Sequence, residues 1–149
     1  MENIFSDEYF MKKAFQEATL AFEKDEVPVG AVIVVDNRII ARAHNLTETL
    51  NDVTAHAEMQ AITAAANFLG GKYLKNCTLY VTLEPCQMCA GALYWSQISK
   101  IVYGAKDAIR GCGVMNTKLH PKTVIKGGVL ETECSELLKQ FFIQKRNLN

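Results

Sequence analysis

The chain has 149 residues, of which 49% are hydrophobic and 21% are charged, and its formal net charge is zero. This length suits one domain with a sizeable core, so we expect a single domain over residues 1–149. Because no run of about 18 apolar residues occurs, a membrane-spanning helix is not expected. The zero net charge excludes a broad positively charged surface for binding nucleic acid, and leaves room only for a local basic patch.

The N-terminal stretch MENIFSDEYFMKK lacks a basic segment followed by an apolar one, which a secretory signal would have. The chain contains five cysteines, an odd number, which suggests reduced thiols rather than a disulfide framework. We therefore expect a cytoplasmic protein without a membrane partner.

The first predicted element is a helix over about residues 7–24, because Ser6 is a suitable N-cap and Asp7 and Glu8 favour the positive end of a helix. Beyond it, strands alternate with helices. These elements are a β-hairpin over 30–35 and 38–42, a helix over 56–69 stopped by two glycines, a strand over 78–82, a helix over 86–96 opened by Pro85, a strand over 100–104, at most one short strand within 122–130, and a helix over 131–146. This alternation predicts an α/β layered domain with a mixed sheet.

The stretch LEPCQMCAG, residues 83–91, places Cys86 and Cys89 after a predicted strand and at the start of a helix. A redox dithiol is one interpretation, since a helix N-terminus lowers a thiol pKa, but metal ligands also occupy such positions. A structural zinc site needs two further ligands, and neither a second Cys-x-x-Cys nor a His-x(3–5)-His is present. The remaining cysteines are isolated and are expected to be small buried residues: Cys77, Cys112 and Cys134.

A third interpretation joins the cysteine pair to the stretch TAHAE at residues 54–58. Three ligands, His56, Cys86 and Cys89, would leave a fourth tetrahedral position for water, which is the arrangement of catalytic zinc. Glu58 would then be a carboxylate outside the ligand set that takes and returns a proton. Residues two apart on a regular helix point about 200° away from each other, so His56 and Glu58 share a pocket only at a loop-to-helix junction. The plainer alternative is that His56 packs and Glu58 merely favours the helix dipole.

The combination of His56-Ala-Glu58 with Pro85-Cys86-x-x-Cys89 matches the signature of the zinc-dependent cytidine/deoxycytidylate deaminase superfamily. Over nearly its whole length the chain also resembles the bacterial tRNA-specific adenosine deaminases. The matching stretches are EVPVGAV (26–32), HN (44–45), TAHAE (54–58), TLYVTLEPCQMCAGAL (78–93), VYGAKD (102–107) and a C-terminal GGVL–EC–LL–FF pattern (127–142).

This resemblance implies a three-layer α/β/α sandwich with a five-stranded mixed sheet, one Zn²⁺ per chain and a homodimer. It implies conversion of adenosine to inosine at the wobble position of a tRNA anticodon loop, with no DNA partner. Zinc hydroxide would attack C6 of the flipped-out base, and Glu58 would carry protons to the ring nitrogen and the departing ammonia. The alternative substrate is a free nucleobase or nucleoside, such as guanine or cytosine.

The resemblance also implies three substrate contacts. Asn45 matches a residue that hydrogen-bonds the target base, the Ala57 N–H lies where the family contacts the ring, and Asp107 matches a position that touches the neighbouring sugar. The chain departs from the family in residues 116–124, a segment that is shorter and lacks an Asn-His-Arg stretch near the RNA. His120 is the candidate replacement within that segment.

Overall fold

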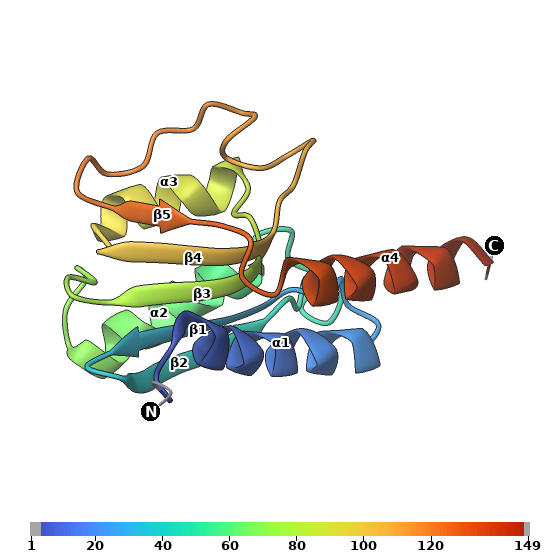
Figure 1. Cartoon of the computed structure of the whole chain (residues 1–149), viewed down its shortest axis with the longest axis horizontal. Helices are drawn as coiled ribbons and strands as arrows, with labels where there is room; N and C mark the ends of the chain where they lie inside the picture. The colour runs from blue at the N-terminus through green and yellow to red at the C-terminus, as the bar shows by residue number, and fades with distance from the viewer. Residues whose placement is uncertain (1–3, 148–149) are drawn as a thin grey trace.

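The computed structural model describes residues 4–147, and its centre is a five-stranded sheet. The strands lie in the order β2-β1-β3-β4-β5 (Figure 1). Their bounds are β1 Gly30–Val35, β2 Arg38–His44, β3 Thr78–Leu83, β4 Lys100–Ala105 and β5 Val124–Lys126. β1 pairs antiparallel with β2 and β3, whereas β4 pairs parallel with β3 and β5. The predicted mixed sheet is therefore confirmed.

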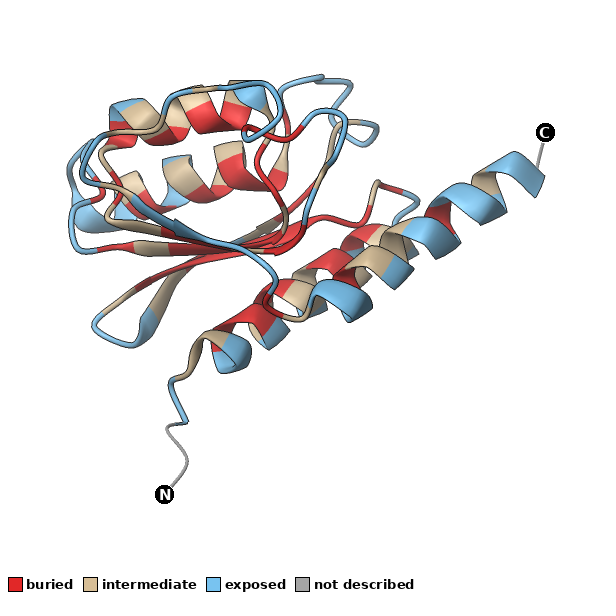
Figure 2. Cartoon of the chain, turned by 45° about the horizontal axis from the view of Figure 1, so that its top comes forward, coloured by how far each residue is buried: buried red, intermediate tan, exposed pale blue. Residues whose placement is uncertain are grey.

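Helices cover both faces of this sheet (Figure 2). α1 (Asp7–Glu23) and α4 (Glu131–Asn147) lie on one face, and α2 (Ala57–Leu69) and α3 (Gln87–Ser96) pack together on the other. This arrangement is the predicted three-layer α/β/α sandwich. α4 continues past the edge of the sheet (Figure 1). Within residues 4–147, none of the helices has the length and apolar character needed to cross a bilayer.

The first helix lies unusually close to the sheet because small residues meet at the contact. Ser6 caps the helix as predicted, accepting a 3.1 Å hydrogen bond from the Tyr9 N–H. The buried face of α1 includes Ala14 and Ala18, which face Gly30 at the start of β1. A Cβ at Gly30 would lie 2.1 Å from the Ala14 carbonyl oxygen, so only glycine permits this approach. The start of β1 is thereby held against the middle of α1.

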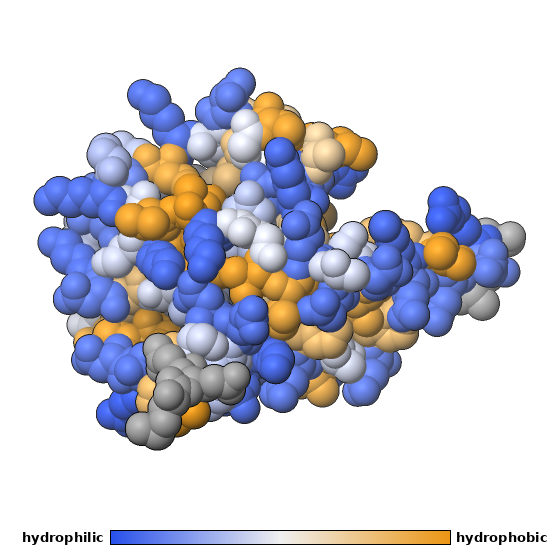
Figure 3. All heavy atoms as spheres, in the orientation of Figure 1, coloured by the Kyte–Doolittle hydropathy of each residue, from blue (hydrophilic) through white to orange (hydrophobic). Residues whose placement is uncertain are grey.

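The hairpin of β1 and β2 turns through Asp36 and Asn37, as predicted. Both residues have positive φ, 50° and 60°, which is the left-handed pair of values that a type I′ turn requires. The core lies on both sides of β1, which is buried along five of its six residues. In contrast, all three residues of β5 are exposed, and Figure 3 shows apolar surface on the face that carries this edge strand and α4.

Several boundaries differ from the sequence prediction by one or two residues, and three of them bear on the site. β2 extends to His44, because its register pairs that residue with Gly30 across the hairpin. α2 and α3 each begin one residue later than predicted, so His56 and Cys86 are the N-cap residues of these helices rather than their first helical residues. The isolated cysteines are all buried and free, as predicted.

Candidate metal centre and substrate cavity

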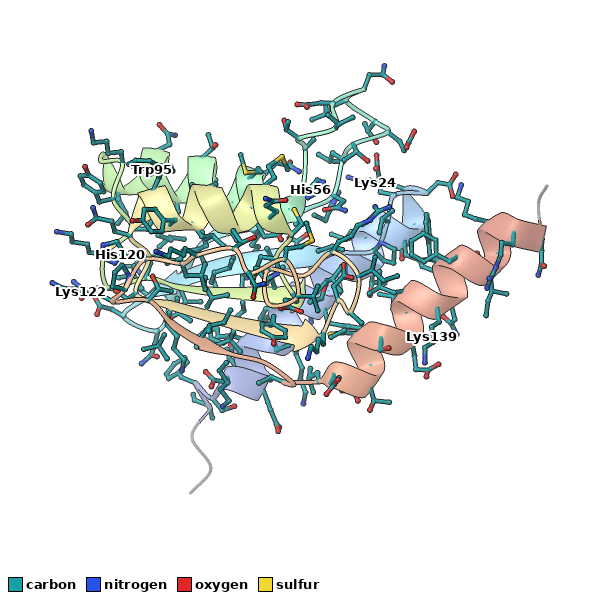
Figure 4. All side chains as sticks on the ribbon, turned by 90° about the horizontal axis from the view of Figure 1, so that it is seen from above. Lys24, His56, Trp95, His120, Lys122 and Lys139 are labelled. Atoms are coloured by element: carbon teal, nitrogen blue, oxygen red, sulfur yellow. The ribbon has the colours of Figure 1, made fainter. Side chains whose placement is uncertain are left out.

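The two loop-to-helix junctions before α2 and α3 bring His56, Cys86 and Cys89 together. The Nδ1 atom of His56 lies 3.6 Å from the Cys86 Sγ atom and 3.5 Å from the Cys89 Sγ atom. All three ligand atoms lie within 4.8 Å of one another, and His56 sits beside sulfur atoms in Figure 4. Among residues 4–147, this trio is the one group of at least three such side chains close enough to share a metal ion. The predicted ligand set is thus assembled in space.

The chemistry of these three side chains fits zinc. Since His56 and Cys86 are N-caps, the positive ends of two helices meet at the cluster and favour thiolate. Hydrogen bonds from Cys89 and His56 lower the pKa of Cys86 to about 4, whereas the pKa of Cys89 is raised because it donates to Cys86. The lowered pKa favours the thiolate form of Cys86, and the charge of a dication would favour it for Cys89 as well.

Glu58 lies in the first turn of α2, next to the cluster but outside the ligand group. Glu58 is only 4% exposed, and burial raises the pKa of its carboxyl group to about 7. A carboxyl group with such a pKa can both accept and release a proton near neutral pH. His56 and Glu58 line the same cavity because His56 precedes the helix and Glu58 lies within it, which is the loop-to-helix junction that the sequence analysis called for.

A cavity of about 630 Å³ opens at this point. Five of the seven predicted site residues line it, while Cys89 and Ala57 are fully buried. Its lining consists of Val27, Val29, Asn45, Thr47, His56, Glu58, Leu83, Glu84, Cys86, Lys106, Asp107, Ala108, Ile109, Arg110, Leu138 and Phe142. Glu58 and two of the three predicted metal ligands therefore share one cavity with two of the three residues predicted to touch substrate, Asn45 and Asp107.

Two of the predicted substrate contacts bind each other. The Ala57 N–H donates a 2.8 Å hydrogen bond to the Asn45 Oδ1 atom, and both residues are buried. This bond fixes the orientation of the Asn45 amide and leaves its NH₂ group as the donor for a ligand. The sequence did not predict this pairing, which occupies the Ala57 N–H within the protein itself.

The third predicted contact, Asp107, is half-buried at the cavity wall. Its Oδ1 atom accepts hydrogen bonds from the N–H groups of Ile109 (3.1 Å) and Arg110 (2.9 Å), so the side chain also closes a turn. Lys106 and Arg110 are exposed beside it. The cavity thus has an acidic wall with cations at its border.

A second cavity, of about 380 Å³, follows α4. It shares Lys106, Leu138 and Phe142 with the first cavity, so the two are neighbours. Its own lining adds Lys139 and Arg146. The apolar and cationic surface therefore continues outward from the metal centre along the C-terminal helix.

Sequence reasoning gave no supporting role to two buried carboxyl groups, Glu26 and Glu84, which are 0% and 4% exposed. Each accepts hydrogen bonds from backbone N–H groups of a loop that borders the cavity: Glu26 from Glu48 and Thr49, and Glu84 from Asp107 and Gly113. The available signal was an acidic residue within an otherwise apolar stretch, EVPVGAV or VTLEPC.

His120 does not lie at this cavity. Its ring is 5.9 Å from that of Tyr94, near the C-terminal end of α3, whereas Cys86 and His56 lie at the other end of that helix. Figure 4 shows His120 and Lys122 well away from His56. His120 therefore lies apart from the metal centre, and its role as the replacement within residues 116–124 stays a prediction.

Comparison with known proteins agrees with this geometry. Residues 5–105 match the family model described as the cytidine and deoxycytidylate deaminase zinc-binding region. The tRNA-specific adenosine deaminase of Bacillus subtilis is 49% identical over 146 residues, covering 94% of this chain and 91% of that protein. The protein of the same description from Aquifex aeolicus is also 49% identical over 146 residues, covering 94% and 96%.

Two solved structures are similar as well. One comes from a study of A-to-I editing by tRNA:A34 deaminases at the wobble position; its TM-score is 0.80 at 43% identity, covering 87% of this chain and 98% of that chain. The other, a guanine deaminase from Bacillus subtilis, has a TM-score of 0.65 at 43% identity, covering 68% and 65%. The fold is therefore shared with proteins that act on different purines.

Proposed function

Because this chain belongs to the cytidine and deoxycytidylate deaminase family, we propose that it is a zinc-dependent hydrolase that converts adenosine to inosine at the wobble position of tRNA. One observation carries the proposal: His56, Glu58, Cys86 and Asn45 line a single cavity in a chain that resembles tRNA-specific adenosine deaminases over almost its full length. The reaction is hydrolytic, releasing ammonia from C6 of the base.

In this proposal His56, Cys86 and Cys89 hold one zinc ion per chain. Such an ion would supply Lewis-acid activation of water near neutral pH. Glu58 takes one proton from the attacking water and delivers it to the ring nitrogen. It then moves the proton of the hydroxyl group now bound to C6 onto the amino group, which leaves as ammonia, and its pKa of about 7 suits both transfers. The NH₂ group of Asn45, oriented by Ala57, donates to the base. Asp107 contacts the neighbouring sugar.

An RNA substrate is supported by the cations near the cavity. Lys106, Arg110, Lys139 and Arg146 border the two adjoining cavities, and Phe142 lies between them as an exposed ring. Side chains of this kind bind phosphates and stack on bases. The second candidate is a free purine base, which the similarity to a guanine deaminase favours.

We also propose a homodimer in the cytoplasm. The proposal is supported by large apolar side chains exposed on both α2 and α3, Phe68 at 60% and Trp95 at 76%. All five cysteines are free, which fits a reducing compartment. Sedimentation velocity of the zinc-loaded protein tests the dimer, and a monomeric profile at micromolar concentration would contradict it.

The substrate is tested by incubating the zinc-loaded protein with an anticodon stem-loop bearing a wobble adenosine, and separately with free adenine, guanine and cytosine. Inosine formed only in the RNA supports the proposal, whereas turnover of a free base alone overturns it.

Two variants test the roles of Glu58 and Cys86. Glu58→Gln is expected to keep one zinc per chain and to lose activity by about 100- to 10,000-fold, and Cys86→Ala is expected to lose both zinc and activity.

A further inference from the structure

Glu84 is a buried carboxyl group that has no role in the mechanism above. It follows β3 and lies two residues before Cys86. Its Oε1 atom accepts a 3.0 Å hydrogen bond from the Asp107 N–H, and its Oε2 atom accepts one of 3.0 Å from the Gly113 N–H. One side chain therefore binds both ends of the segment formed by residues 106–113, which we call the 106–113 loop.

The backbone on either side of Glu84 adds to this attachment. The Glu84 N–H donates to the Ala105 carbonyl (2.8 Å), and the Cys112 N–H donates to the Pro85 carbonyl (2.9 Å). Cys86 itself forms an isolated antiparallel bridge with Gly111. The 106–113 loop is thus attached along residues 84–86, a three-residue segment that also carries a metal ligand.

Glycines in the loop make room for the carboxyl group. A Cβ at Gly111 would lie 2.3 Å from the Glu84 Oε1 atom, and a Cβ at Gly113 would lie 3.0 Å from its Oε2 atom. The first distance is too short for any real contact, so a side chain at Gly111 would displace the carboxyl group or the loop. The loop sequence is therefore matched to the presence of a buried glutamate.

We propose that Glu84 is a positioning residue for substrate: it holds the 106–113 loop, with Asp107 and Arg110, at a fixed distance from the metal centre. Both of its oxygen atoms are occupied by loop N–H groups, so it acts through the loop rather than on the base. The link to the metal centre is short, because only Pro85 separates Glu84 from Cys86. The inference rests on the proposed function for its substrate.

The decisive experiment is Glu84→Gln in the zinc-loaded protein. An amide in this place turns one acceptor into a donor that faces a loop N–H. Because a hydrogen bond to a charged group is lost, KM for the stem-loop is expected to rise about tenfold or more, with kcat changed less than about threefold. Zinc content stays at one per chain. Hydrogen exchange at the Asp107 and Gly113 amides becomes faster, while exchange in β1 and β3 does not change.

A glycine series tests the same contact from the other side. Gly111→Ala is expected to raise KM and loop exchange at least as much as Glu84→Gln, and Gly113→Ala to raise them less. Gly71→Ala is the matched control, because a Cβ there meets nothing within 4 Å. It is expected to leave KM, kcat and exchange unchanged.

Four outcomes overturn the inference. Three are unchanged loop exchange in Glu84→Gln, a loss of kcat at constant KM, and loss of zinc from that variant. The fourth is a lower melting temperature with unchanged KM, which would indicate a purely stabilising role. If the wild-type protein makes no inosine in the stem-loop, the proposed function fails. Loop exchange in the variants then still decides whether Glu84 fixes the loop.

Discussion

Two loops border the cavity, and each is fixed by the same pair of devices. Residues 45–56, which we call the 45–56 loop, connect β2 to α2, and the 106–113 loop follows β4. Each loop donates backbone N–H groups to a buried glutamate outside it, Glu26 in the first case and Glu84 in the second. Each also contains an aspartate that closes a turn within the loop. The two sides of the cavity thus have parallel construction.

The difference between them is where these carboxyl groups face. Glu84 and Asp107 line the cavity, whereas Glu26 and Asp52 are not among its lining residues. The carboxyl groups that support the 45–56 loop therefore lie away from the cavity, whereas those that support the 106–113 loop lie at its wall. Substitutions in the first loop should separate stability from binding, and substitutions in the second should change both together.

The largest effect is expected at Asn45, the residue that the 45–56 loop presents to the ligand. Asn45→Ala removes both the acceptor for the Ala57 N–H and the donor for the base, and we expect kcat/KM to fall about 100- to 1,000-fold. Asn45→Asp keeps the acceptor but loses the donor, so it should lose as much activity while unfolding more like the wild-type protein. Steady-state kinetics and urea unfolding measure the two effects. An active Asn45→Asp protein would mean that Asn45 serves only to hold Ala57.

The next effect is expected at Glu26, which supports the same loop from outside the cavity. Its oxygens accept from the N–H groups of Glu48 (3.0 Å) and Thr49 (2.6 Å) and from the Thr49 hydroxyl (2.6 Å). Glu26→Gln places an amide donor against one of these donors, and we expect the free energy of unfolding to fall by about 2 kcal/mol. If the change in KM, expressed as a free energy, is larger than the loss in the free energy of unfolding, the distinction between the two loops is wrong.

The same variant has a pH signature. Burial by itself would raise the pKa of Glu26, but the hydrogen bonds from Thr49 and Glu48 hold it below its ordinary value of 4.5. The stabilisation is therefore complete above pH 4.5 and is lost as the pH falls through the lower pKa of the folded state. Urea midpoints of the wild-type protein should fall more steeply than those of Glu26→Gln below that pH. Parallel curves would contradict the assignment.

The smallest effects come from the two turn-closing aspartates, compared as a matched pair. Asp52 Oδ1 accepts from the Thr54 N–H and hydroxyl, and Asp107 Oδ1 accepts from Ile109 and Arg110. Asparagine keeps that one acceptor in both places. Asp52→Asn should therefore change neither KM nor the melting temperature, whereas Asp107→Asn should raise KM for the stem-loop about three- to tenfold. Equal effects would remove the distinction between the loops.

The sequence was sufficient to predict the metal centre because its members are recognisable by type. His56, Cys86 and Cys89 carry side chains with few other uses at such spacings, and their positions before two predicted helices brought them together. The hydrogen bonds of Glu26 and Glu84 were not predicted, since their partners are backbone N–H groups, which every residue other than proline possesses. No sequence pattern identifies which backbone N–H group of a loop a buried carboxyl group will bind.

The element boundaries show the same limit. The polar and alanine residues at the end of β2 gave no sign that the strand continues to His44, because that extension depends on pairing with Gly30. Likewise, the Asn45–Ala57 hydrogen bond joins the end of a strand to the start of a helix across the whole 45–56 loop. Such contacts depend on the path of the chain between two elements, which local propensity does not specify.

The type I′ turn at Asp36 and Asn37 has a consequence for the order in which the cavity is formed. The β1–β2 hairpin needs no other element to close, and hairpins of this kind form in about 1–10 μs. The parallel β3–β4 pair must wait for the crossover through α3, which makes its contacts less local. Because synthesis begins at the N-terminus, the wall that ends at Asn45 can fold before Cys86 and Cys89 have left the ribosome. We therefore expect the cavity to be completed last, when the helix that carries Cys89 docks onto the sheet.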